Sequence, residues 1–196
     1  MKIERHSTYP IDQIFLDRWS PRAFDSATMP ISDLLTILEA ARWAPSAYNI
    51  QPWRFLYSLR DDAYWQRYLS LLDEFNEDWA RHASALIFVL SDTVMPGNES
   101  RKDKPSHYHS FDTGAAWAQL ALQATSLGYH THAMAGLHFE KSRKSLVIPK
   151  RYQVEIAIAI GKRTDQSMLP AELQEIERPS QRNPIDEIAF AGLFPQ

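Results

Sequence analysis

The sequence predicts an α+β fold, in which a central mixed, mainly antiparallel sheet is wrapped by helices. Short apolar segments with the character of strands alternate irregularly with helical segments, and this arrangement is typical of α+β domains rather than of repeated βαβ units. One such segment, residues 85–90, is continuously apolar, as expected of a strand covered on both faces. A chain of 196 residues without an internal repeat or a long linker fits a single domain over residues 1–196.

Three helices and one strand are expected before the buried strand at residues 85–90. Pro10 can begin the first helix, because proline is favoured in a first helical turn. Ser32 is the expected N-cap of a second, amphipathic helix, which Pro45 ends. A strand over residues 53–57 and a helix over about residues 63–79 should follow.

The second half is expected to contain a long loop, one helix and two strands. Residues 92–109 are polar, and loops of this length are usually functional or mobile. The helix expected from residue 112 to residue 127 is apolar almost all round, so it should be buried in the core or at a subunit interface. Strands over residues 129–134 and 154–160 complete the predicted sheet.

The C-terminal tail combines prolines with large apolar residues. Three prolines follow Arg178, yet apolar side chains continue almost to the end of the chain: Ile185, Ile188, Phe190, Leu193 and Phe194. A disordered tail is normally poor in such residues. We therefore expect the tail to dock on the partner subunit of a homodimer.

The overall composition argues against several classes of function. The formal net charge of -3 argues against nucleic acid as a partner, because a surface that follows phosphates needs a cationic surplus. The absence of cysteine excludes disulfides, thiolate nucleophiles and iron–sulfur clusters. The first residues lack the apolar run of a secretory signal, and residues 85–90 are too short a run to cross a bilayer. We expect a cytoplasmic protein without a membrane partner.

A polar segment near the N-terminus has the residue types of an anion site. Arg18, Ser20 and Arg22 alternate, so an extended backbone would place their side chains on one side. Two guanidinium groups and a hydroxyl group suit an anion with several hydrogen-bond acceptors. Taken alone, the same residues could form a solvated loop whose arginines pair with surface carboxylates.

Three further segments contain polar or small residues that packing of the fold does not require. Asn49 and Gln51, within residues 45–53, can read an amide or imide edge, although turns commonly use such residues. The cations of residues 161–163 could hold a phosphate or could simply end a strand. Gly136 would let a planar ligand approach the backbone closely.

Three short motifs follow one another along the chain. They are R-x-S-x-R-x-F over residues 18–24, P-S-x-x-N-x-Q-P-W over residues 45–53, and D-x-G-A-A over residues 112–116, which leads to M-A-G over residues 134–136. In this order they resemble the nitroreductase family of FMN-dependent NAD(P)H oxidoreductases, and the resemblance extends to about residue 163. It implies one nitroreductase-like FMN-binding domain that works as a homodimer, with the flavin at the subunit interface.

The resemblance also implies a set of FMN-binding residues. The phosphate and ribityl chain are assigned to Arg18, Trp19, Ser20, Lys162 and Arg163. The pyrimidine edge is assigned to Arg22, Asn49, Gln51 and Asn76. One ring face is assigned to Pro45, Ser46 and Ala47, and the surroundings of the ring's N5 to Met134, Ala135 and Gly136. No catalytic side chain is expected, because the flavin performs the chemistry and the protein supplies position and charge.

Two positions depart from better-known members of the family. Ala135 stands where some members carry an acidic residue, so no side-chain role is expected there. Trp79 stands where a flavin-contacting lysine can occur. A cation such as Arg22 near the pyrimidine edge would stabilise the anionic reduced flavin.

The implied function is transfer of hydride from NAD(P)H through the flavin to nitroaromatic, quinone or similar small electrophilic acceptors. No G-x-G-x-x-G motif follows a strand, so donor and acceptor should use one pocket in turn, and we expect ping-pong kinetics. Residues 92–109, with His107, Tyr108 and His109, are a candidate wall of that pocket. Other chemistry on the same fold, such as enone reduction, dehalogenation or flavin cleavage, and a flavin-binding protein without turnover are the alternatives.

The seven histidines suggest a metal site as a rival hypothesis. His107 and His109, and likewise His130 and His132, would each place two imidazoles on one side of an extended segment. Neither motif contains an acidic residue, so no metal is expected. A hydrolase is not expected either, because no serine lies in a G-x-S-x-G motif.

Overall fold

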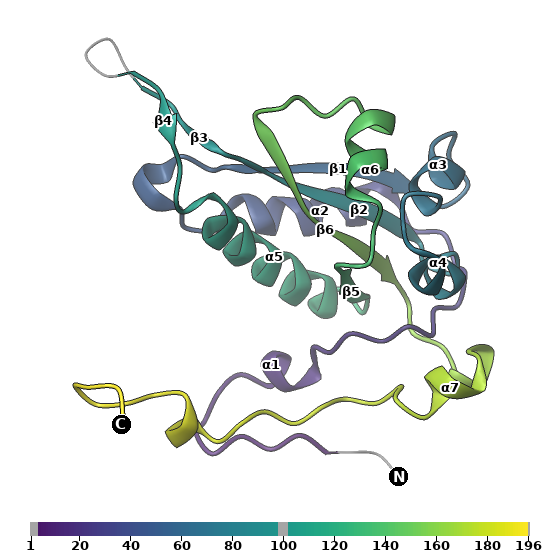
Figure 1. Cartoon of the computed structure of the whole chain (residues 1–196). Helices are drawn as coiled ribbons and strands as arrows, with labels where there is room; N and C mark the ends of the chain where they lie inside the picture. The colour runs from purple at the N-terminus through teal and green to yellow at the C-terminus, as the bar shows by residue number, and fades with distance from the viewer. Residues whose placement is uncertain (1–3, 98–101, 196) are drawn as a thin grey trace.

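A four-stranded sheet forms the centre of the molecule (Figure 1). In the computed structural model, which describes residues 4–97 and 102–195, the strands lie in the order β1-β2-β6-β5. Their bounds are Trp53–Leu59 for β1, Ala85–Asp92 for β2, Tyr152–Gly161 for β6 and His130–Met134 for β5. The predicted α+β class and the helical covering are confirmed. Each of the three pairings is antiparallel, so within the described residues the sheet is not mixed.

Two helices cover one face of the sheet, α2 (Ile31–Arg42) and α5 (His109–Ser126). Ile37 of α2 and Leu120 of α5 are fully buried in one apolar cluster with Ile158 of β6. Burying a side chain of this size stabilises the fold by about 1.5–3 kcal/mol. The face of α2 that packs on the sheet is formed by Leu34, Ile37 and Ala41, whereas Leu35, which helical periodicity also predicts on the apolar stripe, is exposed.

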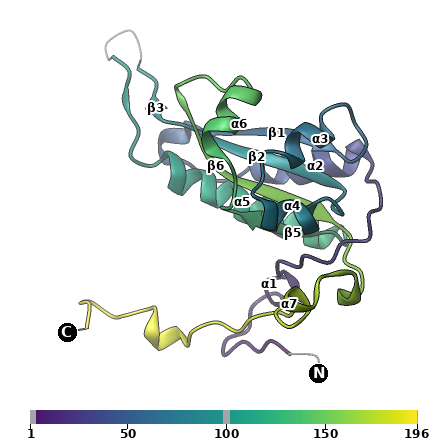
Figure 2. The same ribbon diagram turned by 45° about the vertical axis from the view of Figure 1, so that its right-hand side comes forward.

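Three short helices cover the other face: α3 (Trp65–Leu69), α4 (Glu74–Ala80) and α6 (Phe139–Ser145). Figure 2 shows them on the side of the sheet opposite α2 and α5. Trp79 of α4 and Phe88 of β2 belong to the second apolar cluster, which fills the space between these helices and the sheet. The central sheet therefore has a separate core on each face.

The two central strands show why the sheet needs both cores. All eight residues of β2 are buried, which confirms the expectation of a strand covered on both faces. On β6, Ala157 belongs to the apolar cluster under α3 and α4, whereas Ile158 belongs to the apolar cluster under α2 and α5. A register shift between Val89 and Leu90 moves Val154 to the alanine side, although simple alternation predicts that it shares a face with Ile158.

The single helix expected over residues 63–79 is wrong, because two helices occupy this segment. Leu71 and Leu72 enter the core between α3 and α4 and interrupt the helical path. Asp73 then begins α4, and its carboxylate Oδ1 accepts a hydrogen bond from the Asn76 N–H at 2.8 Å. An N-cap of this kind starts a new helix rather than continuing an old one.

Other helix ends also differ from the expectation. The N-cap of α2 is Pro30, so Ser32 lies inside the helix instead of capping it. The first helix, α1, spans only Gln13–Asp17, and α5 begins at His109, three residues earlier than expected. Helix α6 was not predicted, because its seven residues carry no strong apolar periodicity.

The described part of residues 92–109 contains a two-stranded hairpin, although a long loop was expected. Strand β3 (Val94–Met95) pairs with β4 (Lys104–Pro105), and Figure 1 shows this β3–β4 hairpin extending beyond the sheet. The segment between them includes residues 98–101, which lie outside the described part of the chain. Helix α5 begins shortly after the hairpin returns.

The two ends of the chain run side by side below the body of the molecule (Figures 1 and 2). The Arg5 guanidinium donates to the Ser180 carbonyl at 3.0 Å, and the Gln181 side chain donates to the Glu4 carbonyl at 3.0 Å. The remaining short elements are α7 (Ala171–Gln174) and single 3-10 turns at Ala47–Asn49, Gln166–Met168 and Ile185–Glu187. Among the described residues, no helix has the length and apolar character needed to cross a membrane.

Candidate functional site

A cationic pocket lies where the N-terminal segment, β5 and the C-terminal segment meet. Its volume is about 310 Å³, and five guanidinium groups contribute to its wall. We call it the arginine pocket; it is lined by Arg5, Arg18, Trp19, Ser20, Arg22, His132, Ile176, Arg178, Ser180 and Arg182. Four of the residues predicted to bind FMN, namely Arg18, Trp19, Ser20 and Arg22, thus share one pocket.

The guanidinium groups in this pocket are close enough to repel one another. Burial and the charge of Arg182 lower the pKa of Arg18. Burial lowers the pKa of Arg5 as well, and the charges of Arg182 and Arg18 act in the same direction. An anion bound among these groups would relieve the repulsion, since it supplies the opposite charge at short range.

One carboxylate partly balances this charge. Glu177 is buried, and its Oε1 accepts hydrogen bonds from the backbone N–H groups of Arg22 at 2.6 Å and of Ala23 at 2.9 Å. Its Oε2 lies 3.7 Å from Nη1 of Arg22. Among the described residues, Nε of Arg22 is buried without a hydrogen-bond partner. Glu177 therefore fixes the backbone of Arg22 and leaves part of its guanidinium fork unused by the protein.

The histidines of β5 lie in this cationic environment and stay neutral. Burial lowers the pKa of His132 to about 4, with the charge of Arg22 as the next cause. Nδ1 of His132 lies 3.1 Å from the carbonyl oxygen of Pro21, so in the neutral ring this nitrogen carries the proton. Burial, followed by the charges of Arg163 and Arg18, lowers the pKa of His130. No cluster of three or more potential metal ligands occurs among the described residues.

At the end of β5, Gly136 contacts α4 rather than open space. A Cβ at this position would lie 2.0 Å from Oδ2 of Asp73 and 2.5 Å from Nδ2 of Asn76. The Gly136 carbonyl accepts hydrogen bonds from the Asp73 N–H and from the Asn76 amide, both at 3.1 Å. From the sequence, glycine was expected here because a planar ligand approaches the backbone closely. In the structure, the side chains of Asp73 and Asn76 already leave no room for a Cβ. Met134 is buried and Ala135 is exposed.

Lys162 and Arg163 lie in different environments, although the family resemblance implies that both hold the phosphate and ribityl chain. The Arg163 guanidinium lies 5.7 Å from the ring centre of Trp19, whereas Nζ of Lys162 lies 5.7 Å from that of Tyr129. Consecutive residues in extended backbone point in opposite directions, which accounts for the separation. Arg163 thus stays beside the arginine pocket, and Lys162 is directed to the α2–α5 side, where Tyr129 donates a hydrogen bond to Asp33.

Residues 45–53 form a second polar region, which we call the amide turn. Tyr48, Asn49 and Gln51 have φ values of 54°, 55° and 53°, in the left-handed region that non-glycine residues rarely adopt. The Ala47 N–H donates to Oδ2 of Asp112 on α5 at 3.0 Å, and the Gln51 N–H donates to Oγ of Ser46 at 3.0 Å. Strain of this kind persists where the surrounding structure enforces it, and such places are often functional.

The amide turn and the arginine pocket are not brought together within one chain. The amide turn leads into β1, and His132 of the arginine pocket belongs to β5. These strands are the opposite edges of the sheet, with β2 and β6 between them. At a spacing of about 4.8 Å, the edge strands are roughly 14 Å apart. The predicted FMN-binding residues of the amide turn and those of the arginine pocket are therefore separated in the single subunit.

Several residues of this site were not predicted from the sequence: Arg5, His132, Arg178 and Arg182 of the pocket wall, and Glu177, which contacts Arg22. Arg5 lies 175 residues from Ser180 in the sequence, yet the two are hydrogen-bonded. No local pattern can indicate such a pairing. The arginines at positions 178 and 182 were the one feature of the sequence that could have indicated a role of the tail in an anion site, because docking through apolar residues alone does not require them.

The candidate pocket wall in residues 107–109 has one defined polar cluster. His109 Nδ1 lies 2.8 Å from Oγ of Ser91, and Glu155 accepts hydrogen bonds from Ser91 and Ser110. His107 and Tyr108 are exposed. His109 thus begins α5 by anchoring it to the ends of β2 and β6.

Comparisons with known proteins identify the family. The model of the nitroreductase family matches residues 16–72 and 58–162. A solved structure described as an oxidoreductase containing FMN shares 51% identity, with a TM-score of 0.94, over 97% of this chain and 96% of that one. The CLA biosynthesis enone reductase of Lactiplantibacillus plantarum is 26% identical over 79% of this chain and 86% of its own. The major NAD(P)H-flavin oxidoreductase of Aliivibrio fischeri is 26% identical over 79% and 88%. The chain belongs to the nitroreductase family.

Proposed function

We propose that this protein is an FMN-dependent oxidoreductase that takes electrons from NAD(P)H and passes them to nitroaromatic, quinone or similar small electrophilic acceptors by a ping-pong mechanism. The observation that carries the proposal is the arginine pocket, where five guanidinium groups converge and part of the Arg22 fork is unused by the protein. The similarity to an FMN-containing oxidoreductase at 51% identity supports the same cofactor.

The residues of the arginine pocket fit the phosphate end of FMN. Arg18 and Ser20 lie together, with Nη1 of Arg18 3.3 Å from Oγ of Ser20. Arg5, Arg178 and Arg182 add cations from the two ends of the chain. A phosphate group carries close to two negative charges at neutral pH, and guanidinium forks bind its oxygens in pairs. We infer that Arg18 and Ser20 bind the phosphate and that the other three arginines close around it.

When bound, FMN supplies the redox chemistry, and the protein's residues control charge and access. Arg22, held by Glu177, places a cation beside the pocket. Neutral His132 donates its Nδ1 proton to the Pro21 carbonyl, which leaves Nε2 as an acceptor. The Asn76 amide is fixed by the Gly136 carbonyl, so its remaining oxygen has a defined direction.

We further infer that a second subunit completes the site. The amide turn carries predicted ring-binding residues but lies across the sheet from the arginine pocket. Gly114 and Ala118 on α5 are exposed, although this helix was expected to be buried all round, and an exposed face of small residues suits a subunit interface. The tail also exposes Leu193 and Phe194.

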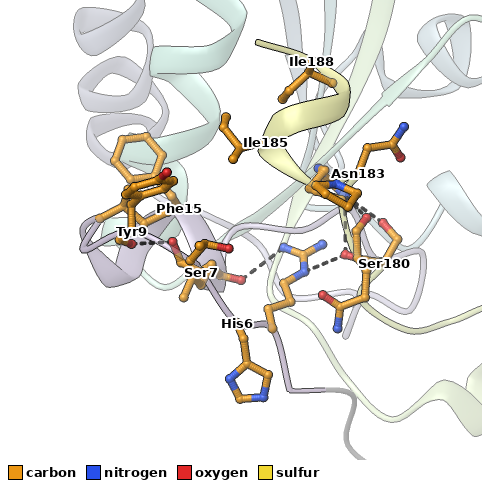
Figure 3. Close-up of a pocket in the computed structure, with 15 residues that line it drawn as sticks. His6, Ser7, Tyr9, Phe15, Ser180, Asn183, Ile185 and Ile188 are labelled. Atoms are coloured by element: carbon orange, nitrogen blue, oxygen red, sulfur yellow. Dashed lines mark hydrogen bonds between the residues drawn. The ribbon is translucent and has the colours of Figure 1, made fainter. Parts of the chain in front are cut away.

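The crossing of the two chain ends supports the same arrangement. A cavity of about 490 Å³ lies between them. Figure 3 shows Tyr9 and Phe15 on one side of it and Ile185 and Ile188 on the other. Apolar side chains that remain open in one subunit are expected to be covered in the assembled protein. In a homodimer, the tail would cover the partner and bring the amide turn of one subunit toward the arginine pocket of the other.

The test begins with the absorption spectrum of freshly purified protein, which should show bound flavin released as FMN. The variant Arg18→Ala should lose most of the flavin, whereas Arg42→Ala, at an exposed arginine of α2, should retain it. Steady-state rates with NADH or NADPH and a panel of nitroaromatic, quinone and enone acceptors should give parallel reciprocal plots. Protein that neither contains nor takes up FMN would refute the proposal, and intersecting plots would refute the ping-pong mechanism.

A further inference from the structure

A second pocket, separate from the arginine pocket, lies where the amide turn meets the β3–β4 hairpin. Its volume is about 320 Å³, and it is lined by Tyr48 and Ile50 from the turn and by Met95, Lys102 and Lys104 from the hairpin. In Figure 1 the hairpin projects from the end of the sheet at which β1 begins. The pocket is therefore beside the turn that we expect to border the flavin.

Tyr48 presents its ring to this pocket from a strained backbone. The side chain is 86% exposed, and its φ of 54° lies in a region that costs a non-glycine residue free energy. Burial cannot explain why a large aromatic residue is kept at such a position, because the ring contributes little to the core. An exposed aromatic ring is well suited to stacking against a nucleotide base.

The hairpin contributes two lysines to this pocket. Lys104 belongs to β4, Lys102 precedes it by two residues, and both line the pocket. Asp103, between them, is not among the residues that line the pocket, and its Oδ1 accepts a hydrogen bond from the Gly97 N–H at 2.8 Å. Lysine ammonium groups bind phosphate as point charges, and two of them in one pocket favour a group with two negative charges.

We propose that this pocket binds the phosphate-bearing adenine end of the electron donor, and that Lys102 and Lys104 favour NADPH over NADH. The proposal rests on the function proposed above for the role of the donor, but the pocket's affinity for the nucleotide fragment does not depend on a flavin. The base would stack on Tyr48, the 2′-phosphate would pair with the lysines, and the nicotinamide would extend along the amide turn toward the flavin. The 2′-phosphate is the only group that distinguishes NADPH from NADH, so charge at this pocket sets the preference.

The test uses the purified full-length protein and 2′,5′-ADP, the fragment of NADPH that lacks nicotinamide. Calorimetric titration should show saturable binding that weakens with salt. The double variant Lys102→Glu/Lys104→Glu should bind the fragment about 10-fold or more weakly. Lys144→Glu, which makes one such charge change at an exposed lysine of α6, should bind it within about twofold of the unaltered protein.

Flavin reduction measured by stopped flow provides the second readout. The double variant should lose its preference for NADPH through a lower kcat/KM for NADPH, while kcat/KM for NADH stays within about twofold. Tyr48→Leu should weaken 2′,5′-ADP by about fivefold through the lost stacking. If the unaltered protein does not bind 2′,5′-ADP, or if the double variant binds it equally well, the proposed subsite is wrong. Loss of affinity for an anionic acceptor such as 4-nitrobenzoate, without loss for 2′,5′-ADP, would also overturn it.

The two proposals fail in different ways. If the protein contains FMN and oxidises NADPH, but its kinetics with NADPH do not change in the double variant, the proposed function stands and the proposed subsite is wrong. If the protein contains no flavin but binds 2′,5′-ADP and the double variant does not, the pocket is a nucleotide site and the proposed function is wrong.

Discussion

At Gly136, any side chain would collide with two polar groups of α4 that hold the end of β5. The Gly136 carbonyl accepts hydrogen bonds from the Asp73 N–H and the Asn76 amide. The Asp73 carboxylate then lies where a Cβ of residue 136 would be. The glycine thus sets both the position of Asn76 and the path of residues 134–136. If FMN binds as proposed, this contact positions one wall of its site.

The variant Gly136→Ala should lower the free energy of unfolding by about 1–3 kcal/mol, because the added methyl group must displace Asp73. Gly114→Ala is the matched change: within one subunit its Cβ would meet nothing within 4 Å, and it lies inside α5. Because this face of α5 is the proposed subunit interface, the comparison is made in protein that lacks residues 184–196 and is expected to be monomeric, where Gly114→Ala should raise stability by about 0.5–1 kcal/mol. Urea unfolding of both variants measures the difference. Equal stability of Gly136→Ala and the unaltered protein would show that Asp73 moves away without cost.

Arg22 should influence the redox potential of the proposed flavin. A cation at about 4 Å contributes at most about 4 kcal/mol at an effective dielectric near 20, which for two electrons is at most roughly 90 mV. Glu177, 3.7 Å from the guanidinium, offsets part of this charge. We therefore expect Arg22→Ala to lower the flavin midpoint potential by less than that limit. Arg22→Lys keeps the positive charge, so it should lower the potential much less. A spectroelectrochemical titration in which Arg22→Ala leaves the potential unchanged would contradict the charge argument.

His132 should make the protein less stable in mild acid. The folded protein holds its pKa at about 4, whereas an unfolded histidine titrates near 6.5, so between these values the unfolded state binds more protons. Stability therefore rises with pH through this window and is lost as the pH falls from about 6.5 toward 4. The loss should reach about 3 kcal/mol.

Urea unfolding at pH 7 and pH 4.5 tests this dependence. His132→Asn can still donate to the Pro21 carbonyl but cannot take up a proton, so it should be markedly less sensitive to pH. His107→Asn, the same substitution at an exposed histidine, is the matched control. A steep acid loss that persists in His132→Asn would assign the effect to other groups.

At the scale of elements, α5 is the support of the amide turn. The buried carboxylate of Asp112, in the first turn of α5, accepts a hydrogen bond from the Ala47 N–H. This contact joins residues 65 apart in the sequence and holds the start of a segment with three positive φ values. Without it, the turn can relax toward ordinary backbone conformations.

Asp112→Ala should therefore destabilise the fold by about 1–3 kcal/mol and weaken flavin binding, since the Ala47 N–H loses its acceptor. Asp112→Asn keeps an oxygen at the same place and should cost less in both measurements. Thermal unfolding and flavin titration of the two variants give the comparison. If alanine and asparagine have the same effect, the lost charge, and not the lost hydrogen bond, is responsible.

At the scale of the whole molecule, the tail is the segment whose shape depends most on assembly. It crosses the N-terminal segment and then leaves large apolar side chains exposed, Phe190, Leu193 and Phe194 among them. Removing residues 184–196 should convert the proposed dimer to a monomer and release flavin, because the arginine pocket and the amide turn would no longer meet.

Light scattering coupled to gel filtration tests the assembly. The double variant Phe190→Ser/Phe194→Ser should weaken the dimer in the same direction as the deletion. Phe75→Ser, at an exposed aromatic residue of α4, should not change the mass. A truncated protein that stays dimeric and keeps its flavin would show that the tail is not part of the interface.

The sequence alone determined the features that depend on local periodicity and on short motifs. These include the α+β class, the buried strand at residues 85–90 and the three motifs typical of nitroreductases. It also indicated that Arg18, Ser20 and Arg22 act on one side of the backbone, because alternation along an extended segment is a property of the chain itself.

Only the tertiary structure decided which distant residues share a pocket. Arg5, Arg178 and Arg182 join Arg18 because the two chain ends cross, and no local pattern contains that crossing. Lys162 leaves the group because strand geometry turns it away from Arg163. Helix α4 begins at Asp73 because Leu71 and Leu72 gain more from entering the core than from continuing a helix. Packing between segments far apart in sequence has a free energy that local propensity does not include.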